Sequence, residues 1–136
     1  MEKNKEALMA FYKKALTVNT ETDPAAVLSP ILADNFVSYG SVDSKGKDGL
    51  INMLNFFWQL VPDLKWEPQD IINEGDKYVV RSKATGAPNG DFMGLPTNGT
   101  KSFDIVTIDI HKVADGKILE VNHLEDWATA MKQLKS

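Results

Sequence analysis

The sequence predicts an α+β fold in which N-terminal helices pack on a strongly curved, mainly antiparallel sheet. Two observations lead to this expectation. Helical periodicity dominates the first half of the chain, and alternating extended segments dominate the second half. Such segregation of helices from strands is typical of the α+β class. A curved sheet covered by helices encloses a cone-shaped space, and we expect one small-molecule pocket there.

Length and composition fit one domain over residues 1–136, since 136 residues with 43% hydrophobic content suit a single core. The chain has no Cys, which excludes disulfides and thiolate sites. A net charge of −4 and a single arginine, Arg81, argue against a nucleic-acid partner. The N-terminus lacks an apolar signal core, and no stretch is long enough to span a bilayer. We therefore expect a cytoplasmic protein with no membrane partner.

Three helices and a strand are predicted in the first half. Apolar residues at three- and four-residue spacing predict a helix over residues 2–19. Asp23–Pro24 supplies an N-cap and a first-turn proline for a short helix, which should end at Ser29–Pro30 because proline disfavours helix in the residue before it. A short strand over residues 35–39 should follow. A wide apolar stripe then predicts a long helix over residues 48–60.

The second half of the chain is predicted to form strands followed by one helix. The predicted strands span residues 65–73, 77–85, 102–113 and 117–124. Turns rich in Gly and Asp separate the members of each pair, as in β-hairpins. Residues 86–99 should form a loop over the pocket mouth, with Phe92 and Met93 dipping inward. Residues 126–134 should close the chain as a helix.

Four short motifs follow one another in a fixed order. They are Phe57–Leu64, with Pro-Asp-Leu; Ile72–Arg81, with Glu-Gly-Asp; Gly86–Gly99; and Asp115–Asp126, which begins Asp-Gly-Lys-Ile. In this order and spacing they resemble the SnoaL-like polyketide cyclases of the nuclear-transport-factor-2-like superfamily. The resemblance covers residues 36–134. It implies a cone-shaped α+β barrel and a lyase- or isomerase-type reaction, the acid/base cyclisation or isomerisation of a hydrophobic carbonyl or polyketide-like substrate without a cofactor.

The resemblance points to Asp126 as the catalytic residue, since it stands where these cyclases have their acid/base aspartate. A carboxylate at the mouth of an apolar cavity loses solvation, its pKa rises, and it becomes a base toward a carbon acid. Asp126 also precedes a helical segment that it can N-cap, and both roles can hold together. Two family histidines fall on Tyr39 and Pro88. Tyr39 is the second catalytic candidate, because a phenol can orient or protonate a substrate oxygen.

Eight further side chains are candidates for lining the pocket, although each apolar one can equally be plain core. They are Phe57, Trp58, Phe92, Met93, Phe103, His111, Glu120 and Asn122. His111 and Asp109 share a strand face, either as a polar pair inside the cone or on a solvated face, and the second is favoured. His123 lies on the face opposite to Asp126 unless a bulge intervenes, so a packed or surface position is expected. No cluster of His and carboxylates indicates a metal site.

Three kinds of function stay open. The first is a small enzyme of the cyclase type. The second is a non-catalytic domain that binds a hydrophobic small molecule. The third is an interaction module that forms a homodimer through its sheet face. Glu120 and Asn122 bear on this choice, because polar residues alternating along a strand must face a ligand, solvent or a second subunit.

Overall fold

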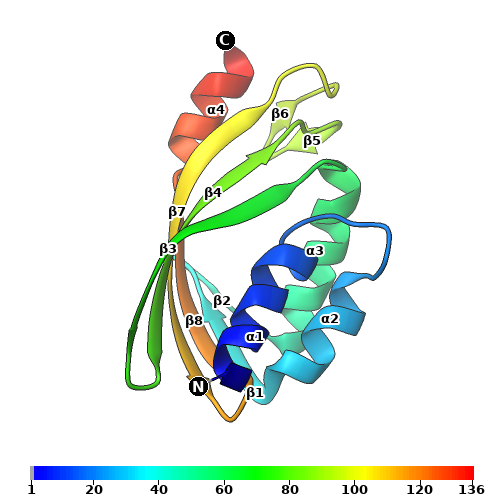
Figure 1. Cartoon of the computed structure of the whole chain (residues 1–136). Coiled ribbons are helices and arrows are strands. Elements are labelled where there is room, and N and C mark those ends of the chain that lie inside the picture. The colour runs from blue at the N-terminus through cyan, green and yellow to red at the C-terminus, as the bar shows by residue number, and fades with distance from the viewer. Residues whose placement is uncertain (1) are drawn as a thin grey trace.

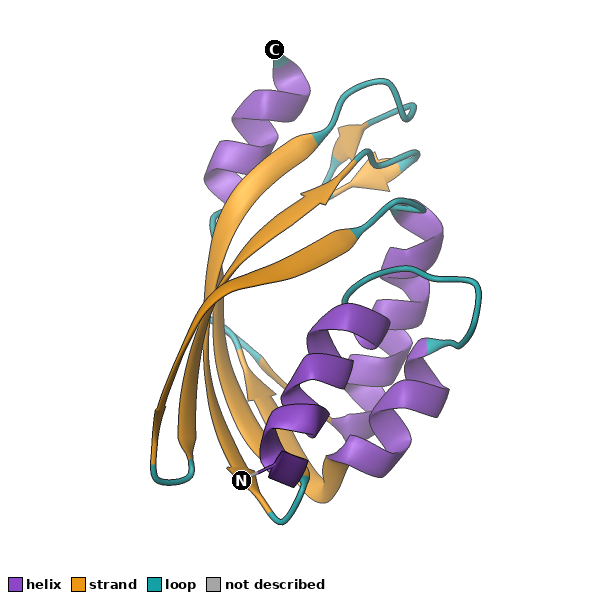
Figure 2. Ribbon diagram, viewed as in Figure 1, coloured by secondary structure: helices purple, strands orange, loops and turns teal. Residues whose placement is uncertain are grey.

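Three helices lie side by side on the concave face of a bent sheet (Figure 1). They are α1 (Glu2–Ala10), α2 (Pro24–Ile31) and α3 (Lys47–Leu60). The last helix, α4 (Trp127–Lys135), lies at the end of the molecule opposite to the N-terminus (Figure 2). The structure is a computed structural model and describes residues 2–136. Within these residues no helix is long and apolar enough to cross a membrane.

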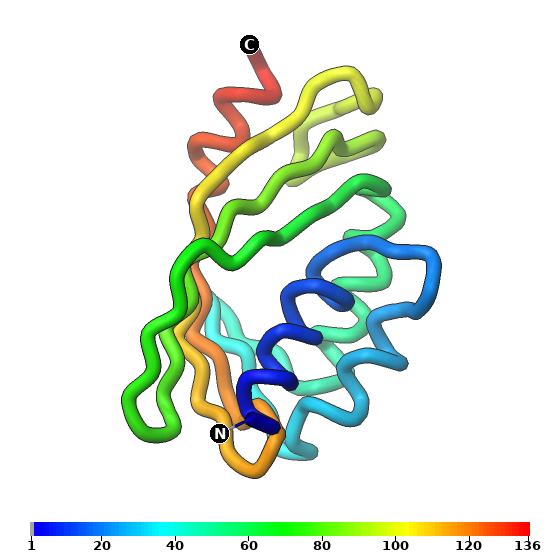
Figure 3. The backbone as a smooth tube through the Cα atoms, in the orientation of Figure 1, coloured from blue at the N-terminus to red at the C-terminus, as the bar shows by residue number. Residues whose placement is uncertain are grey.

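The main sheet has the strand order β2-β1-β8-β7-β4-β3. Its strands are β1 (Leu32–Tyr39), β2 (Ser44–Gly46), β3 (Lys65–Glu74), β4 (Lys77–Gly86), β7 (Phe103–Ala114) and β8 (Lys117–Glu125). Every neighbouring pair is antiparallel except β1 and β8, which run parallel. The long strands bend in their middle (Figure 3). The predicted α+β class with a mainly antiparallel, strongly curved sheet is confirmed.

Short strands form where the sequence predicted only loops and turns. β5 (Asp91–Phe92) and β6 (Leu95–Pro96) form a separate hairpin. In Figure 1 this hairpin lies near the C-terminal end of α3. Met93 at its tip has a φ of 52°, a left-handed conformation that is uncommon for a residue with a side chain. Strand β2 was missed because three residues are too few for an alternation pattern.

The first helix changes character where it meets the sheet. After α1 the chain makes a π-helical turn, η1 (Phe11–Ala15), closed by a bond from the Leu16 N–H to the Phe11 carbonyl at 2.9 Å. The helix thus stops earlier than predicted. Phe11 and Tyr12 are both buried, whereas the two lysines that follow them are exposed. Single π-helical turns are rare and often mark functional sites.

The second helix begins where the sequence predicted but ends later. Asp23 caps it as predicted, with its Oδ1 accepting from the Ala26 N–H at 2.9 Å. The predicted stop at Ser29–Pro30 is wrong, because α2 runs on to Ile31 with Pro30 inside it. Pro30 stands in the last turn, where its cost is confined to the helix end. The buried residue Leu28 fixes the helix against the core.

Candidate functional site

A cavity of about 200 Å³ lies between the helices and the inner face of the sheet. Most of its wall is apolar, from Phe11, Leu16, Leu50, Met53, Leu54, Phe57, Trp66, Met93, Val121 and Trp127. Five polar side chains interrupt this wall, namely Ser38, Lys45, Asp109, His123 and Glu125. They come from four adjacent strands, β1, β2, β7 and β8. An apolar cavity with a few convergent polar groups is the usual form of a small-molecule site.

The polar part of the wall starts from strand β7. Thr107, Asp109 and His111 occupy alternate positions, so all three point to the same face, and each is at most 3% exposed. Buried polar groups need hydrogen-bond partners. Thr107 has one in the indole Nε1 of Trp66, which donates to its hydroxyl at 3.0 Å. Asp109 is the member of this row that also lines the cavity.

Asp109 is a buried carboxyl group held from one side. The Tyr12 hydroxyl in η1 donates to its Oδ2 at 2.6 Å. The pKa of Asp109 is raised from 3.8 to about 7. Burial is the main cause and the charge of Glu125 adds to it, while the hydrogen bond from Tyr12 and the charge of His123 lower the pKa. A carboxyl with a pKa near neutrality can both accept and release a proton under ordinary conditions.

Tyr12 connects Asp109 to a fully buried histidine. The Tyr12 oxygen lies 2.7 Å from Nε2 of His111. Burial lowers the pKa of His111 from 6.5 to about 3, so its ring is neutral near neutral pH. Burial also raises the pKa of Tyr12, with the charge of Asp109 as the second cause. Tyr12 and His111 are therefore neutral groups behind the carboxyl.

His123 and Glu125 form a hydrogen-bonded pair of ionisable side chains in the cavity wall. His123 lies directly opposite Asp109 in the β7–β8 ladder. Its Nδ1 is 2.7 Å from a carboxylate oxygen of Glu125. The hydrogen bond to Glu125 raises the pKa of His123, whereas its partial burial and the positive charge of Lys45 act against this. The cavity thus contains a carboxyl group and an imidazole whose pKa values are both raised from their ordinary values.

A β-bulge decides which residues of β8 face the cavity. The register of β7 and β8 shifts by one between the pairs Val113–Ile118 and Lys112–Glu120, so Leu119 is the extra residue. Beyond the bulge Val121, His123 and Glu125 face inward. Glu120 and Asn122, named as candidates for the pocket, therefore do not contact it, and the alternative of a face turned to solvent or a second subunit remains. Both lie on the outer face, and neither lines the cavity.

Asp126 is not in the cavity wall. It is the N-cap of α4, with Oδ1 accepting from the Thr129 N–H at 3.1 Å and Oδ2 from the Thr129 hydroxyl at 2.6 Å. These bonds lower the pKa of the exposed Asp126 carboxyl. The expected rise of this pKa is therefore wrong, and the alternative interpretation as a helix cap is confirmed. Tyr39 is 42% exposed and likewise lies outside the cavity wall.

The remaining candidates divide between the cavity and the core. Phe57 and Met93 line the cavity. Phe92 and Phe103 instead stack on each other in the core, with ring centroids 5.6 Å apart. Trp58 points to η1, where its Nε1 donates to the Ala15 carbonyl at 2.8 Å.

His111 is buried, so the favoured interpretation as a solvated strand face is wrong. The other alternative, a polar pair with Asp109 inside the fold, is what the structure contains. The row of polar residues at positions 107, 109 and 111 was the signal in the sequence. Tyr12 had no such signal, because it looks like any apolar-face residue of an amphipathic helix.

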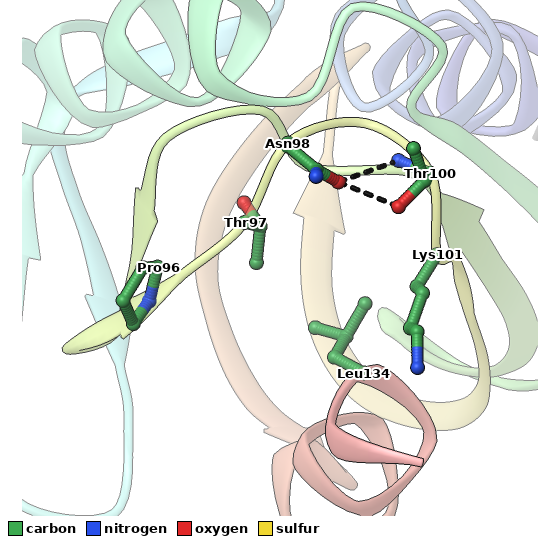
Figure 4. Close-up of a pocket in the computed structure, with 6 residues that line it drawn as sticks. All are labelled: Pro96, Thr97, Asn98, Thr100, Lys101 and Leu134. Carbon is green, nitrogen blue, oxygen red and sulfur yellow. Dashed lines mark hydrogen bonds between the residues drawn. The ribbon is translucent and has the colours of Figure 1, made fainter.

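A second hollow, of about 320 Å³, lies between the loop after β6 and the end of α4 (Figure 4). Its lining includes Leu134 and one ionisable side chain, Lys101. Asn98 there accepts from the backbone and hydroxyl of Thr100, which is a local turn contact. This hollow lacks paired acid and base groups. Among residues 2–136 no group of three or more His, Asp or Glu side chains is placed to hold a metal ion.

The family model of the SnoaL-like polyketide cyclases matches residues 6–134. The chain belongs to this family. No curated protein matches the chain significantly. The expected membership, drawn from the four motifs, is confirmed.

Solved structures agree with this membership at the level of the fold. A proposed SnoaL-like polyketide cyclase from Jannaschia sp. CCS1 superposes with a TM-score of 0.86 at 22% identity, over 99% of this chain and 93% of that one. IdmH, a proposed polyketide cyclase from Streptomyces antibioticus, gives 0.82 at 24% identity, over 98% and 99%. A Catenulispora acidiphila protein with a ketosteroid isomerase-like fold, solved with trimethylamine, gives 0.77 at 12% identity, over 96% and 92%.

Proposed function

We propose that this protein is an acid–base enzyme that acts on an enolisable carbonyl compound with a hydrophobic, aromatic or polyketide-like body. One observation carries the proposal. The Asp109 carboxyl lines an apolar cavity with a pKa of about 7, so it can take a proton from a carbon next to a carbonyl group. Membership of a cyclase family is consistent with this chemistry.

Asp109 and His123 suit the two steps of such a reaction, the removal of a proton and its return. Asp109 removes the proton, and the electrons of the broken C–H bond form the enolate. When the enolate attacks a second carbonyl of the same molecule, the new alkoxide needs a proton. His123 is suited to supply it, because Glu125 favours its protonated form. Without a second carbonyl the same groups return the proton elsewhere, which is an isomerisation.

The proposal can be tested with 2-tetralone, a small bicyclic ketone with acidic C–H bonds. In D₂O, proton NMR follows the loss of these protons by exchange. The wild-type protein should accelerate the exchange, and Asp109→Asn should reduce the acceleration by at least about a hundredfold. Asp126→Asn is the matched control, since it makes the same chemical change at the exposed helix cap.

Two results would contradict the proposal. One is equal exchange by the wild type and Asp109→Asn. The other is a wild-type protein that binds 2-tetralone, by titration of the cavity resonances, without accelerating exchange. The second result would favour a binding domain over an enzyme.

We also propose that a second copy of the chain covers the outer face of the sheet. Val106, Ile108, Ile110 and Leu124 form an exposed apolar strip there, 41–62% accessible. An ion pair between Lys83 and Asp104, 3.1 Å apart, lies beside the strip. An apolar centre with a charged rim is the usual anatomy of an interface, and a two-fold axis pairs such a strip with itself.

A further inference from the structure

Behind the cavity, Asp109 ends a buried chain of three groups that finishes in an atom without a partner. The Tyr12 oxygen stands between Asp109 Oδ2, at 2.6 Å, and His111 Nε2, at 2.7 Å. Nδ1 of His111 is buried and has no hydrogen-bond partner within residues 2–136. The ring packs edge-on against Phe11 and Tyr12, with centroids 5.3 and 5.7 Å away.

The single hydroxyl proton of Tyr12 allows two arrangements. In the first, His111 carries its proton on Nε2 and donates to the Tyr12 oxygen, while Tyr12 donates to Asp109. In the second, protonated Asp109 donates to Tyr12, which donates to a bare Nε2, and the His111 proton sits on Nδ1. The second arrangement buries an N–H group without an acceptor. Unpaired buried N–H groups are rarer in proteins than unused acceptor lone pairs, so the first arrangement is favoured.

The two oxygens of Asp109 are therefore unequal. Oδ2 is occupied by the Tyr12 hydroxyl. Among the side-chain hydrogen bonds of residues 2–136, none involves Oδ1, and this atom is also absent from the fully buried atoms that lack a partner. Because Asp109 lines the cavity, Oδ1 is the oxygen open to it.

We propose that His111 is a positioning residue whose proton on Nε2 directs the Tyr12 hydroxyl to Oδ2 of Asp109, so that Asp109 gains and loses its proton at Oδ1. Proton transfer is thereby aimed into the cavity. The consequence for catalysis rests on the acid–base function proposed above, whereas the tautomer of His111 does not depend on it.

Three further ionisable side chains lie around Asp109, but none of them is hydrogen-bonded to its carboxyl group. Glu125 and His123 face it from β8, and their charges act on its pKa in opposite directions. Lys45 on β2 lies by His123 and is paired with Asp43 at 3.2 Å. Near neutral pH, Asp109 is the one member of the three-group chain that titrates, because burial leaves His111 and Tyr12 neutral.

The tautomer can be read directly from protein labelled with ¹⁵N in its histidines. Long-range proton–nitrogen correlation spectra between about pH 5 and pH 9 should show His111 with a protonated Nε2 and a bare Nδ1 throughout. His111→Gln identifies the resonances, because it removes one of only two histidines. A proton on Nδ1, or a ring that becomes charged in this range, would overturn the proposal.

The influence of His111 on Asp109 can be measured from the carboxyl ¹³C shift of Asp109. Tyr12→Phe removes the hydroxyl donor and should raise the pKa of Asp109 by about one unit. His111→Leu removes the group that polarises this hydroxyl, so a smaller rise is expected. His111→Gln should return the pKa toward that of the wild type, because an amide N–H can again donate to Tyr12.

An unchanged pKa of Asp109 in His111→Leu, with the native fold retained, would refute the positioning role. If that variant does not fold, the tautomer of the wild type still decides. Neither measurement needs a substrate. A protein that passes both but binds 2-tetralone without accelerating its exchange would refute the proposed function and leave the inference about the proton intact.

Discussion

In the middle of strand β7 the two faces reverse the usual distribution of residues. Its inward positions include Thr107, Asp109 and His111, which are at most 3% exposed. Its outward positions include Val106 and Ile108, which are 49% and 44% exposed. In most proteins polar residues face water and aliphatic residues face the core. The reversal identifies two different demands on one strand, a buried polar site on one side and a surface to be covered on the other.

The two reversals differ in their physical cost. An exposed aliphatic side chain costs little, because apolar atoms make up much of any protein surface. A buried carboxyl group is expensive in its ionised form. A pKa of about 7 for Asp109 corresponds to about 4 kcal/mol against the ionised folded state at high pH. A residue retained at that cost is more informative about function than one that is neutral to stability.

The largest expected effect is therefore a gain of stability on the inner face. Because the folded protein holds a proton on Asp109 that the unfolded chain has lost, the stability from this group is lost as pH rises from about 4 to about 7. Asp109→Asn removes the penalty and should raise the free energy of unfolding at pH 8 by about 2–4 kcal/mol. Urea denaturation measures it. Asp104→Asn, exposed on the same strand, is the control and should change little.

On the outer face the expected effect is on association. Ile108→Lys places a charge in the centre of the exposed strip, so self-association should weaken by about a hundredfold while the fold is retained. Sedimentation equilibrium at several protein concentrations measures the change. Val42→Lys, at an exposed loop tip, should leave association unaltered. If Ile108→Lys and the wild type associate equally, the strip is not the interface.

The pH dependence of stability distinguishes the contribution of Asp109 from that of His111. Folded His111 lacks a proton that the unfolded chain binds below pH 6.5, so its contribution is lost as pH falls toward about 3. Between about pH 4 and 6.5 this opposes the contribution of Asp109, so the contributions of these two groups nearly cancel in the wild type.

Single variants should expose the two slopes. Asp109→Asn should become less stable on acidification from pH 6.5, by about 1.4 kcal/mol per unit. His111→Leu should become less stable as pH rises from about 4 to about 7. Urea midpoints across this range measure both. Parallel profiles for the two variants would contradict the assignment.

The smallest effect is expected at Asp126, the carboxylate that faces solvent. Asp126→Ala removes the cap bonds to Thr129. The midpoint of thermal unfolding should fall by a few degrees, because an N-cap stabilises only its own helix. Exchange of 2-tetralone should be unchanged. A large loss of exchange in this variant, with the fold intact, would return Asp126 to the catalytic role that the family resemblance implied.

The local physics of the sequence determined most of the fold. Periodicity specified the type and order of the long helices and strands, and Asp23 and Asp126 marked two helix starts as N-caps. The four motifs indicate the family from the sequence alone. These features depend on neighbours within a few positions along the chain, and for that reason one sequence is enough to recognise them.

The site depended on contacts that no local pattern contains. A single extra residue, Leu119, turns Glu120 and Asn122 outward and brings His123 opposite Asp109. The π-helical turn brings Tyr12 to Asp109 across a sequence separation of 97 residues. The alternation of residues along a strand cannot reveal a bulge. Amphipathic spacing cannot distinguish a tyrosine that only packs in the core from one that also donates a hydrogen bond to a carboxyl group. Packing of η1 on β7 decides both the burial of Asp109 and its pKa, and only the tertiary structure contains it.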